Sequence, residues 1–307
     1  MTKNKKHSET SIFIISVVAN LLLAIIALYY GIKTGSEAIK LDGYYSFAGF
    51  ILALISLWVV KMVMKPESSN YNFGYATIEP LFNLVKGLMI LTVVLSSSVN
   101  AVKSLLSGGN TPSFGESIVY FFISTITCLV LTLLFYNKNK KAPSPIIHVE
   151  YKNWFVDTII SASIGVAFIS SYFLQNTNFD SLIKYTDPII TLAIILFILK
   201  LPLTTIKTGI KEILLSAPDN DIVNKIDLII KDVICNYDVE DYNFKATKTG
   251  REIYLLVHIQ VINEADRLYS IKTQDEVREE MKHQLDKCFD NIKLDIAFSE
   301  NKILYDF

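Results

Sequence analysis

Two acidic residues stand in long apolar stretches, where an unpaired charge is costly. Asp42 precedes the run Phe-Ile-Leu-Ala-Leu-Ile-Ser-Leu-Trp-Val-Val that ends before Lys61, and Asp157 lies in a second apolar run. An ionisable group inside a membrane span is by default a functional hypothesis. A carboxylate in that environment can bind a cation or exchange a proton. The first question is therefore whether the two runs share one ion.

The composition predicts two domains of different character. The chain has 307 residues, 51% of them hydrophobic, with a net charge of -1 and a mean hydropathy of +0.38, values beyond those of ordinary soluble proteins. The apolar content lies before residue 206, which predicts a transmembrane domain over 1–206 and a cytoplasmic α+β domain over 207–307. The near-neutral charge implies no nucleic-acid partner.

The apolar runs are long enough to cross a lipid bilayer. A helix needs about 20 residues to span the hydrocarbon layer. Six runs qualify, which predicts an all-α six-helix transmembrane domain and excludes a soluble enzyme: 11–32, 41–60, 81–106, 116–136, 153–174 and 182–203.

Lysines in the short loops predict the orientation of these spans. They follow the second, fourth and sixth runs and also precede the first, whereas the loops 107–115 and 175–181 have none. Lys33 and Lys40 are exceptions to the pattern. Because cytoplasmic loops carry the excess of positive charge, we expect an integral membrane protein with both termini in the cytoplasm, placed in the plasma membrane.

The last hundred residues or so carry the pattern of a small α+β module. Helical periodicity covers 218–235 and 271–289, and alternation over 242–248 and 252–261 around Thr249-Gly250 predicts a hairpin. Alternation returns over 292–298. The expected order is α-β-β-α-β.

This arrangement resembles the cation diffusion facilitator (cation efflux) family. The resemblance covers nearly the whole chain and rests on four segments that occur in the family's order: Ser36-Glu37-Ala38-Ile39-Lys40-Leu41-Asp42-Gly43-Tyr44-Tyr45-Ser46, Phe73-Gly74-Tyr75-Ala76-Thr77-Ile78-Glu79-Pro80-Leu81, Asn153 to Asp157 with Ser161, and Asp187-Pro188. The resemblance implies a homodimeric secondary transporter that exports a divalent metal ion, often in exchange for protons.

The resemblance also implies where the ion binds. The family uses a His or Asp followed four residues later by an Asp on span two, with a similar pair on span five; residues at this spacing share one helix face. The matching positions are Tyr45 and Gly49 on span two, and Asn153 and Asp157 on span five. Of these residues, Asp157 alone is an ordinary metal ligand at neutral pH, which is a departure from the family pattern.

An ion bound here would meet oxygen donors. The expected shell is the Asp157 carboxylate, the Asn153 amide oxygen and the Tyr45 hydroxyl, with Ser46, backbone or water. Oxygen ligands suit manganese or magnesium better than zinc; the transported cations considered are manganese, iron and zinc, and no permanently bound cofactor is expected. Asp42 lies about 10 Å along the helix from position 49. Two roles are expected for Asp42. It is either a carboxylate on the ion path, or a residue that caps the span or faces the outer vestibule.

A lysine lies at a similar expected depth. Lys86 is seven residues past Glu79, about 10 Å along the third span, and Asp157 is placed equally deep. A lone buried charge needs a partner, so one hypothesis pairs Lys86 with Asp157 and puts the ammonium where relatives hold a metal ion. The alternative is that Lys86 extends to the interface.

Three functions follow from these observations. The first is a transporter with an altered site. The second is a degenerate family member that moves no metal and acts as a regulatory or dimerising membrane protein, which would explain the lost ligands. The third is a sensor whose tail binds a ligand, although the tail has few clustered His, Cys or carboxylate ligands. We favour the first, because the scaffold and Asp157 are intact.

Overall fold

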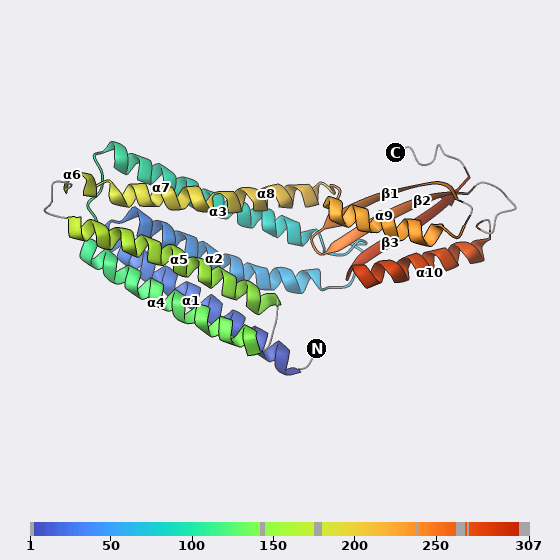
Figure 1. Cartoon of the computed structure of the whole chain (residues 1–307), viewed down its shortest axis with the longest axis horizontal. Coiled ribbons are helices and arrows are strands. Elements are labelled where there is room, and N and C mark those ends of the chain that lie inside the picture. The colour runs from blue at the N-terminus through green and yellow to red at the C-terminus, as the bar shows by residue number, and fades with distance from the viewer. Residues whose placement is uncertain are drawn as a thin grey trace. The chain divides into compact units, whose positions relative to one another are not determined.

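The computed structural model describes residues 3–141, 145–174, 180–237, 239–261, 268 and 270–300. Figure 1 shows a long helical part followed by a small α/β part. The elements in chain order are α1 (Lys3–Thr34), α2 (Glu37–Val63), α3 (Ile78–Leu106), α4 (Phe114–Lys141), α5 (Pro145–Leu174), α6 (Asp180–Ile183), α7 (Thr186–Ile198), α8 (Lys200–Ile213), α9 (Asn220–Ile234), β1 (Val239–Thr249), β2 (Glu252–Val261), α10 (Ile271–Cys288) and β3 (Ile292–Ser299). This order confirms the predicted fold class, a helical domain followed by an α-β-β-α-β domain.

The chain divides into two compact units that are not two simple halves of the sequence. The helical unit contains residues up to Leu57 together with Lys86–Thr205, and the mixed unit contains Trp58–Val85 and Ile206–Phe307. The mixed unit thus includes the end of α2, the α2–α3 loop and the start of α3, which the sequence-based ranges assigned to the first domain. Both α2 and α3 therefore contribute residues to each unit.

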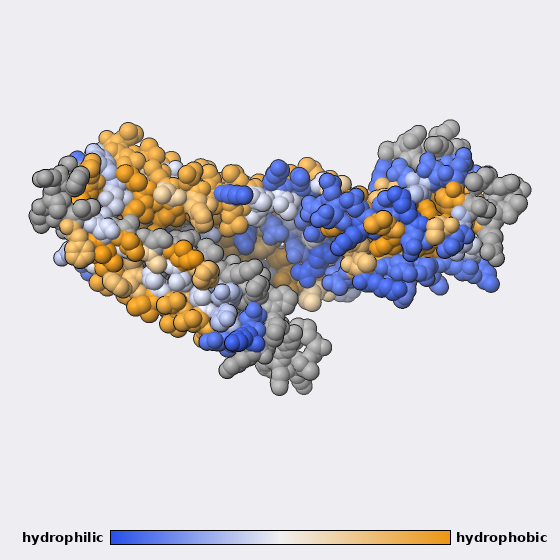
Figure 2. All heavy atoms as spheres, in the orientation of Figure 1, coloured by the Kyte–Doolittle hydropathy of each residue, from blue (hydrophilic) through white to orange (hydrophobic). Residues whose placement is uncertain are grey.

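The helical unit has the apolar surface of a membrane protein. In the described part of the chain, five helical segments have the length and hydropathy of a span: Ile14–Thr34, Glu37–Val63, Ile78–Leu106, Gly115–Lys140 and Thr186–Ile213. A shorter apolar stretch, Asp157–Phe173, lies in α5 at the fifth predicted span. Figure 2 shows hydrophobic residues over the visible face of these helices, and Leu196 is 78% exposed. Such a surface is suited to lipid rather than water.

The last predicted span consists of two helices rather than one continuous helix. α7 ends at Ile198 and α8 begins at Lys200. Pro202 lacks the N–H group that would bond the carbonyl of Ile198, and its ring crowds that carbonyl. The next backbone bond, from Leu203 N–H to the Leu199 carbonyl, is stretched to 3.5 Å. The apolar segment nevertheless continues through α8 to Ile213, ten residues beyond the predicted end at 203.

The mixed unit is built on a three-stranded sheet. β1 and β2 form an antiparallel hairpin that turns at Gly250, whose φ of 59° is the left-handed conformation that glycine tolerates. β3 pairs with β2 in parallel, and α10 makes the crossover. The core contains Ile226 and Ile230 from α9 and Val277 and Met281 from α10, packed against the buried residues of the sheet.

A lysine ties the α2–α3 loop to this sheet. The Nζ of Lys293, on β3, lies 2.7 Å from Glu67 Oε1 and 3.3 Å from Glu252 Oε2, and it donates to the Phe73 carbonyl at 3.3 Å. Burial lowers the pKa of Lys293, but the hydrogen bond to Glu67 and the charge of Glu252 outweigh burial, and the net pKa is raised above the usual lysine value. The loop and the sheet therefore pack as one unit through charged contacts.

Candidate functional site

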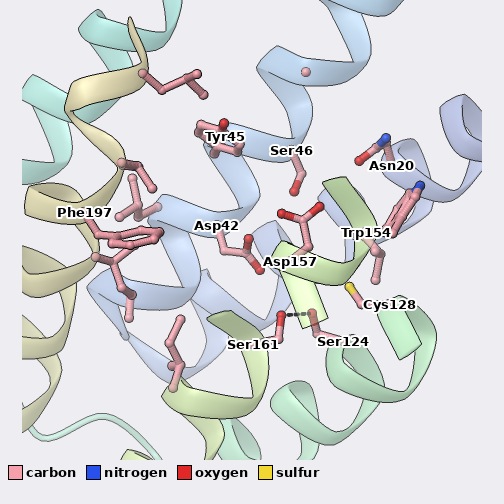
Figure 3. Close-up of a pocket in the computed structure, with 18 residues that line it drawn as sticks. Asn20, Asp42, Tyr45, Ser46, Ser124, Cys128, Trp154, Asp157, Ser161 and Phe197 are labelled. Carbon is pink, nitrogen blue, oxygen red and sulfur yellow. Dashed lines mark hydrogen bonds between the residues drawn. The ribbon is translucent and has the colours of Figure 1, made fainter. Parts of the chain in front are cut away.

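A cavity of about 240 Å³ lies among the helices of the helical unit. Its walls come from α1, α2, α4, α5, α7 and α8, and Figure 3 draws the residues that line it. The closest helix packing around it joins α4 to α5, and α1 packs against α4. The cavity therefore lies between the group formed by α1, α4 and α5 and the helices α2 and α7.

Asp42 and Asp157 both line this cavity. Figure 3 shows their carboxylates directed into the same space, Asp42 from α2 and Asp157 from α5. α2 begins at Glu37, so Asp42 lies more than one turn inside the helix. Two carboxylates from different helices that face one cavity form the basis of a cation site.

Glycines allow α1 and α2 to approach closely beside Asp42. A Cβ at Gly43 would lie 3.0 Å from the backbone nitrogen of Leu28, and one at Gly31 would lie 3.0 Å from the backbone nitrogen of Lys40. Both values are tighter than ordinary van der Waals contact. The two small residues thus let α2 pack on α1, which sets where Asp42 enters the cavity.

Tyr120 holds the Asp42 carboxylate from α4. The Tyr120 hydroxyl donates a hydrogen bond to Asp42 Oδ2, and the Tyr120 side chain is fully buried. A carboxylate has about four lone-pair sites, so this bond leaves acceptor positions for a cation. Tyr120 thereby fixes one side of Asp42 and leaves the other facing the cavity.

The remaining polar lining consists of small hydroxyl groups, an amide and a thiol. Ser124 on α4 and Ser161 on α5 are buried, and their hydroxyl oxygens lie 3.2 Å apart. Cys128 is a free, buried cysteine, and Asn20 contributes an amide from α1. In Figure 3 the Ser46 hydroxyl points toward Asp157. The polar atoms of the lining are therefore mainly oxygens.

The other residues that the sequence predicted for the ion site do not all lie at the cavity. Tyr45 lines the cavity, but in Figure 3 its hydroxyl points away from the two carboxylates. Asn153 belongs to α5, and its side chain is outside the described part of the structure. Gly49 lines the cavity, and a Cβ there would meet no atom within 4 Å. Lys86 is exposed on α3 and does not belong to the cavity lining, so its pairing with Asp157 stays a hypothesis.

The contribution of α4 was missed from the sequence, although a signal exists. Tyr120, Ser124 and Cys128 are spaced four residues apart, which puts them on one helix face. A polar stripe of this spacing in an otherwise apolar span indicates an inward-facing side. Its partners, Asp42 and Ser161, could not be assigned to it without the packing of α4 on its neighbours.

The donor set is smaller than that of a preformed metal centre. In the ranges that the structure describes, no group of three His, Cys, Asp or Glu side chains gathers as a metal cluster. Two carboxylates with hydroxyl and amide oxygens can still hold a hard cation that keeps some of its water. The arrangement suits transient binding of a cation.

The comparison with known proteins assigns the family. Residues 13–214 match the model of the cation efflux transmembrane domain, and the chain therefore belongs to the cation efflux family. Members are membrane transporters of metal cations rather than enzymes, in agreement with the apolar helices and with the two carboxylates that face one cavity.

Individual relatives are similar to this chain at low identity. The manganese efflux system protein MneP of Bacillus subtilis is 20% identical over 295 residues, covering 95% of this chain and 96% of the relative. The human proton-coupled zinc antiporter SLC30A2 is 23% identical over 281 residues, or 88% of this chain and 73% of the relative. The magnetosome protein MamM of Paramagnetospirillum magneticum is 22% identical over 173 residues, about half of each chain.

Proposed function

We propose that this chain exports a divalent metal cation, and that Asp42 and Asp157 bind the ion together. The observation that carries the proposal is that the two carboxylates line one cavity between apolar helices. Two negative charges match a divalent cation, and removing only one of them would leave a buried charge imbalance. Ser46, Ser161 and water complete the oxygen shell in this proposal.

Proton exchange is the proposed energy source. When the cation leaves, two carboxylates remain in one cavity, and the repulsion between like charges is costly unless protons bind. A cycle in which protons replace the ion and are released when the next ion binds removes this cost. The name of the SLC30A2 relative, a proton-coupled antiporter, supports this mechanism.

Manganese is the preferred candidate for the cargo. The cavity supplies mostly oxygen donors, which suit manganese better than zinc, and the MneP relative is a manganese efflux protein. Zinc and iron are the alternatives. Zinc is supported by the SLC30A2 relative and by the Cys128 thiol, a softer donor in the cavity wall.

The proposal extends to assembly and placement. Cation efflux proteins are usually homodimers, and we propose that the mixed unit holds two copies together. The lysine-rich loops support cytoplasmic termini, and a plasma membrane location is part of the same proposal.

Flux measurements on purified protein in liposomes test this function. Manganese, iron, zinc, cobalt, cadmium and magnesium are supplied in turn, with and without a pH gradient. We expect manganese flux that depends on the gradient and is lost in Asp157→Ala and in Asp42→Ala. Asp275→Ala, which removes a carboxylate that is 62% exposed on α10, is the control and should transport normally.

A degenerate family member is the second candidate. Gly49 supplies no ligand, and no cluster of three His, Cys, Asp or Glu side chains occurs in the described ranges. Such a chain would act as a regulatory or dimerising membrane protein. The absence of flux for every ion, from a protein that is folded and dimeric, would favour this function over transport.

A further inference from the structure

A buried carboxylate outside the cavity lies where three connecting segments of the helical unit meet. Asp187, the second residue of α7, has no exposed surface. Its Oδ1 accepts a hydrogen bond from the Ser36 hydroxyl at 2.6 Å, and its Oδ2 accepts one from the Asn110 amide at 3.1 Å. Ser36 lies between α1 and α2, and Asn110 lies between α3 and α4. One side chain therefore joins α7 to two turns that are 77 and 151 residues away in sequence.

The same carboxylate satisfies the start of α2. The first N–H groups of a helix have no partner within it. Asp187 accepts from the backbone N–H of Glu37 at 2.8 Å and of Ala38 at 3.3 Å. The Ile39 N–H donates to the Ser36 hydroxyl at 3.2 Å, which makes Ser36 the N-cap. Every free N–H at this end of α2 is thus paired, and two of them depend on a residue of another helix.

The electrostatics favour a carboxylate at this point. Helix N-termini carry a partial positive charge, which attracts anions within the first turn. Asp187 lies in the first turn of α7 and at the first turn of α2. Its four donors are all neutral, so the two helix ends supply the compensation that a buried carboxylate requires.

The turns around Asp187 pack at close range. The Asn110 N–H donates to the Lys184 carbonyl at 2.6 Å, and the Asn110 amide also donates to the Gly35 carbonyl at 2.8 Å. A Cβ at Gly109, where φ is +94°, would lie 2.6 Å from the Lys184 carbonyl oxygen. The three turns are therefore held in one arrangement, with Asp187 at its centre.

This arrangement sets the position of the cavity walls. Asp42 follows Ala38 by four residues, about 6 Å along α2. Ile194, Phe197 and Ile198 of α7 line the same cavity and begin seven residues after Asp187. α2 packs on α1 at Gly31 and Gly43, and its start is held by Asp187, so both contacts set its height and rotation.

We infer that Asp187 is a positioning residue for ion binding: it fixes the start of α2 against α7 and so holds the Asp42 carboxylate level with Asp157. The inference rests on the proposed function, because it assumes that these two carboxylates bind the cargo. Asp187 itself does not contact the ion.

Two measurements on the full chain test this inference. The first is the KM for manganese flux in liposomes. The second is the rate at which N-ethylmaleimide modifies Cys128, with Cys235→Ser and Cys288→Ser as background; the chain has three cysteines, and Cys128 is a 3% exposed residue of the cavity wall. The second measurement needs no transport and therefore separates this inference from the proposed function.

Three variants are compared with one matched control. Asp187→Leu removes every acceptor, Asp187→Asn keeps the shape and one oxygen, and Ser36→Ala removes one donor and the N-cap. Glu116→Gln is the control, because Glu116 is an exposed carboxylate of the same unit that pairs with Lys33 at 2.8 Å. We expect the KM to rise about tenfold in Asp187→Leu and about threefold in the milder variants, with Cys128 modified about five to ten times faster. The control should match the parent protein.

The two measurements distinguish a positioning role of Asp187 from a purely structural one. A purely structural role would reduce the amount of folded protein and leave the KM and the Cys128 rate of the remainder unchanged, and that result would overturn the inference. If the Asp187 variants do not fold, Ser36→Ala decides in the same way. If the parent protein moves no manganese, the proposed function fails, and an unchanged Cys128 rate would additionally overturn the positioning role.

Discussion

Both units of this protein carry surface ion pairs, such as Lys33–Glu116 in the helical unit, but among the described residues the helical unit also places carboxylates in its interior. In the helical unit, Asp187 is fully buried and Asp42 faces an internal cavity, and the groups that donate hydrogen bonds to them in the described part of the chain are neutral hydroxyl, amide and backbone groups. In the mixed unit, charges pair with charges at the surface, as in Arg251–Glu79 and Lys282–Asp286. Surface pairs contribute little to stability, whereas a buried carboxylate is costly unless it is compensated.

This difference affects the free energy of unfolding of the two units. If the two carboxylates of the cavity bind the cargo as proposed, they lower the stability of the helical unit whenever the site is empty. The mixed unit derives its stability from an apolar core between its sheet and two helices. Substitutions in the two units should therefore affect transport and stability in different proportions, and the following variants test that contrast.

The largest effect is expected for Asp157→Asn. The substitution keeps the size of the side chain and removes a charge from the cavity, so ion flux should fall by at least about a hundredfold. Because an amide is less costly to bury than a carboxylate, the melting temperature in detergent should stay the same or rise. Flux and thermal unfolding are measured on the same preparation. A fall in melting temperature would show that Asp157 stabilises the helical unit, contrary to the contrast drawn above.

Gly49→Asp should have the next largest effect, in the opposite direction. A side chain at this position meets open space and lies in the cavity wall. A carboxylate about 10 Å from a cation, the axial separation of position 49 from Asp42, contributes about 1 to 2 kcal/mol per unit charge in a partly polar medium, so the KM for manganese should fall about tenfold. Gly49→Ala is the control for the backbone. An unchanged KM in the aspartate variant would place the ion away from this part of α2.

Tyr120→Phe should give a moderate effect. The phenylalanine keeps the buried ring and removes the hydrogen bond to Asp42, a contribution of about 1 kcal/mol, so the KM should rise about fivefold. Tyr30→Phe serves as the control, because the Tyr30 ring packs 5.9 Å from that of Tyr120. Equal behaviour of the two variants would show that Tyr120 contributes packing alone.

The smallest effect is expected for Lys293→Met in the mixed unit. The lysine side chain is 37% exposed, so its ion pairs are screened and their loss should cost at most about 1 kcal/mol of unfolding free energy. Its pKa is raised in the folded state; the stability it contributes is present below the unfolded-state pKa and is lost only as the pH rises through the folded-state pKa. The effect should therefore be constant between about pH 6 and 9 and shrink in high salt. A changed KM for manganese would show that the α2–α3 loop controls the ion site.

Most of the fold was predictable because its signals are local. Runs of apolar residues fix the position of the spans, and periodicities of 3.6 and 2 distinguish the helices from the strands of the last domain. The break near Leu199 was also accessible in principle, since Pro202 follows it directly. What the sequence did not indicate was that residues 58–85, the end of α2, the α2–α3 loop and the start of α3, belong with the mixed unit, because Lys293 and Glu67 are 226 residues apart.

The sequence by itself determined that Asp157 lies in an apolar run long enough to span a membrane, and the family resemblance predicted that Tyr45 and Gly49 stand at the usual ligand positions. Only the tertiary structure showed that Asp42 faces the same cavity as Asp157 and that Tyr120 donates a hydrogen bond to Asp42. The same holds for Asp187, which accepts hydrogen bonds from the first N–H groups of α2. Spacing along one helix determines which residues share a face. The offset of one helix against another depends on contacts between distant residues, such as Ser36 with Asp187, that no local pattern records.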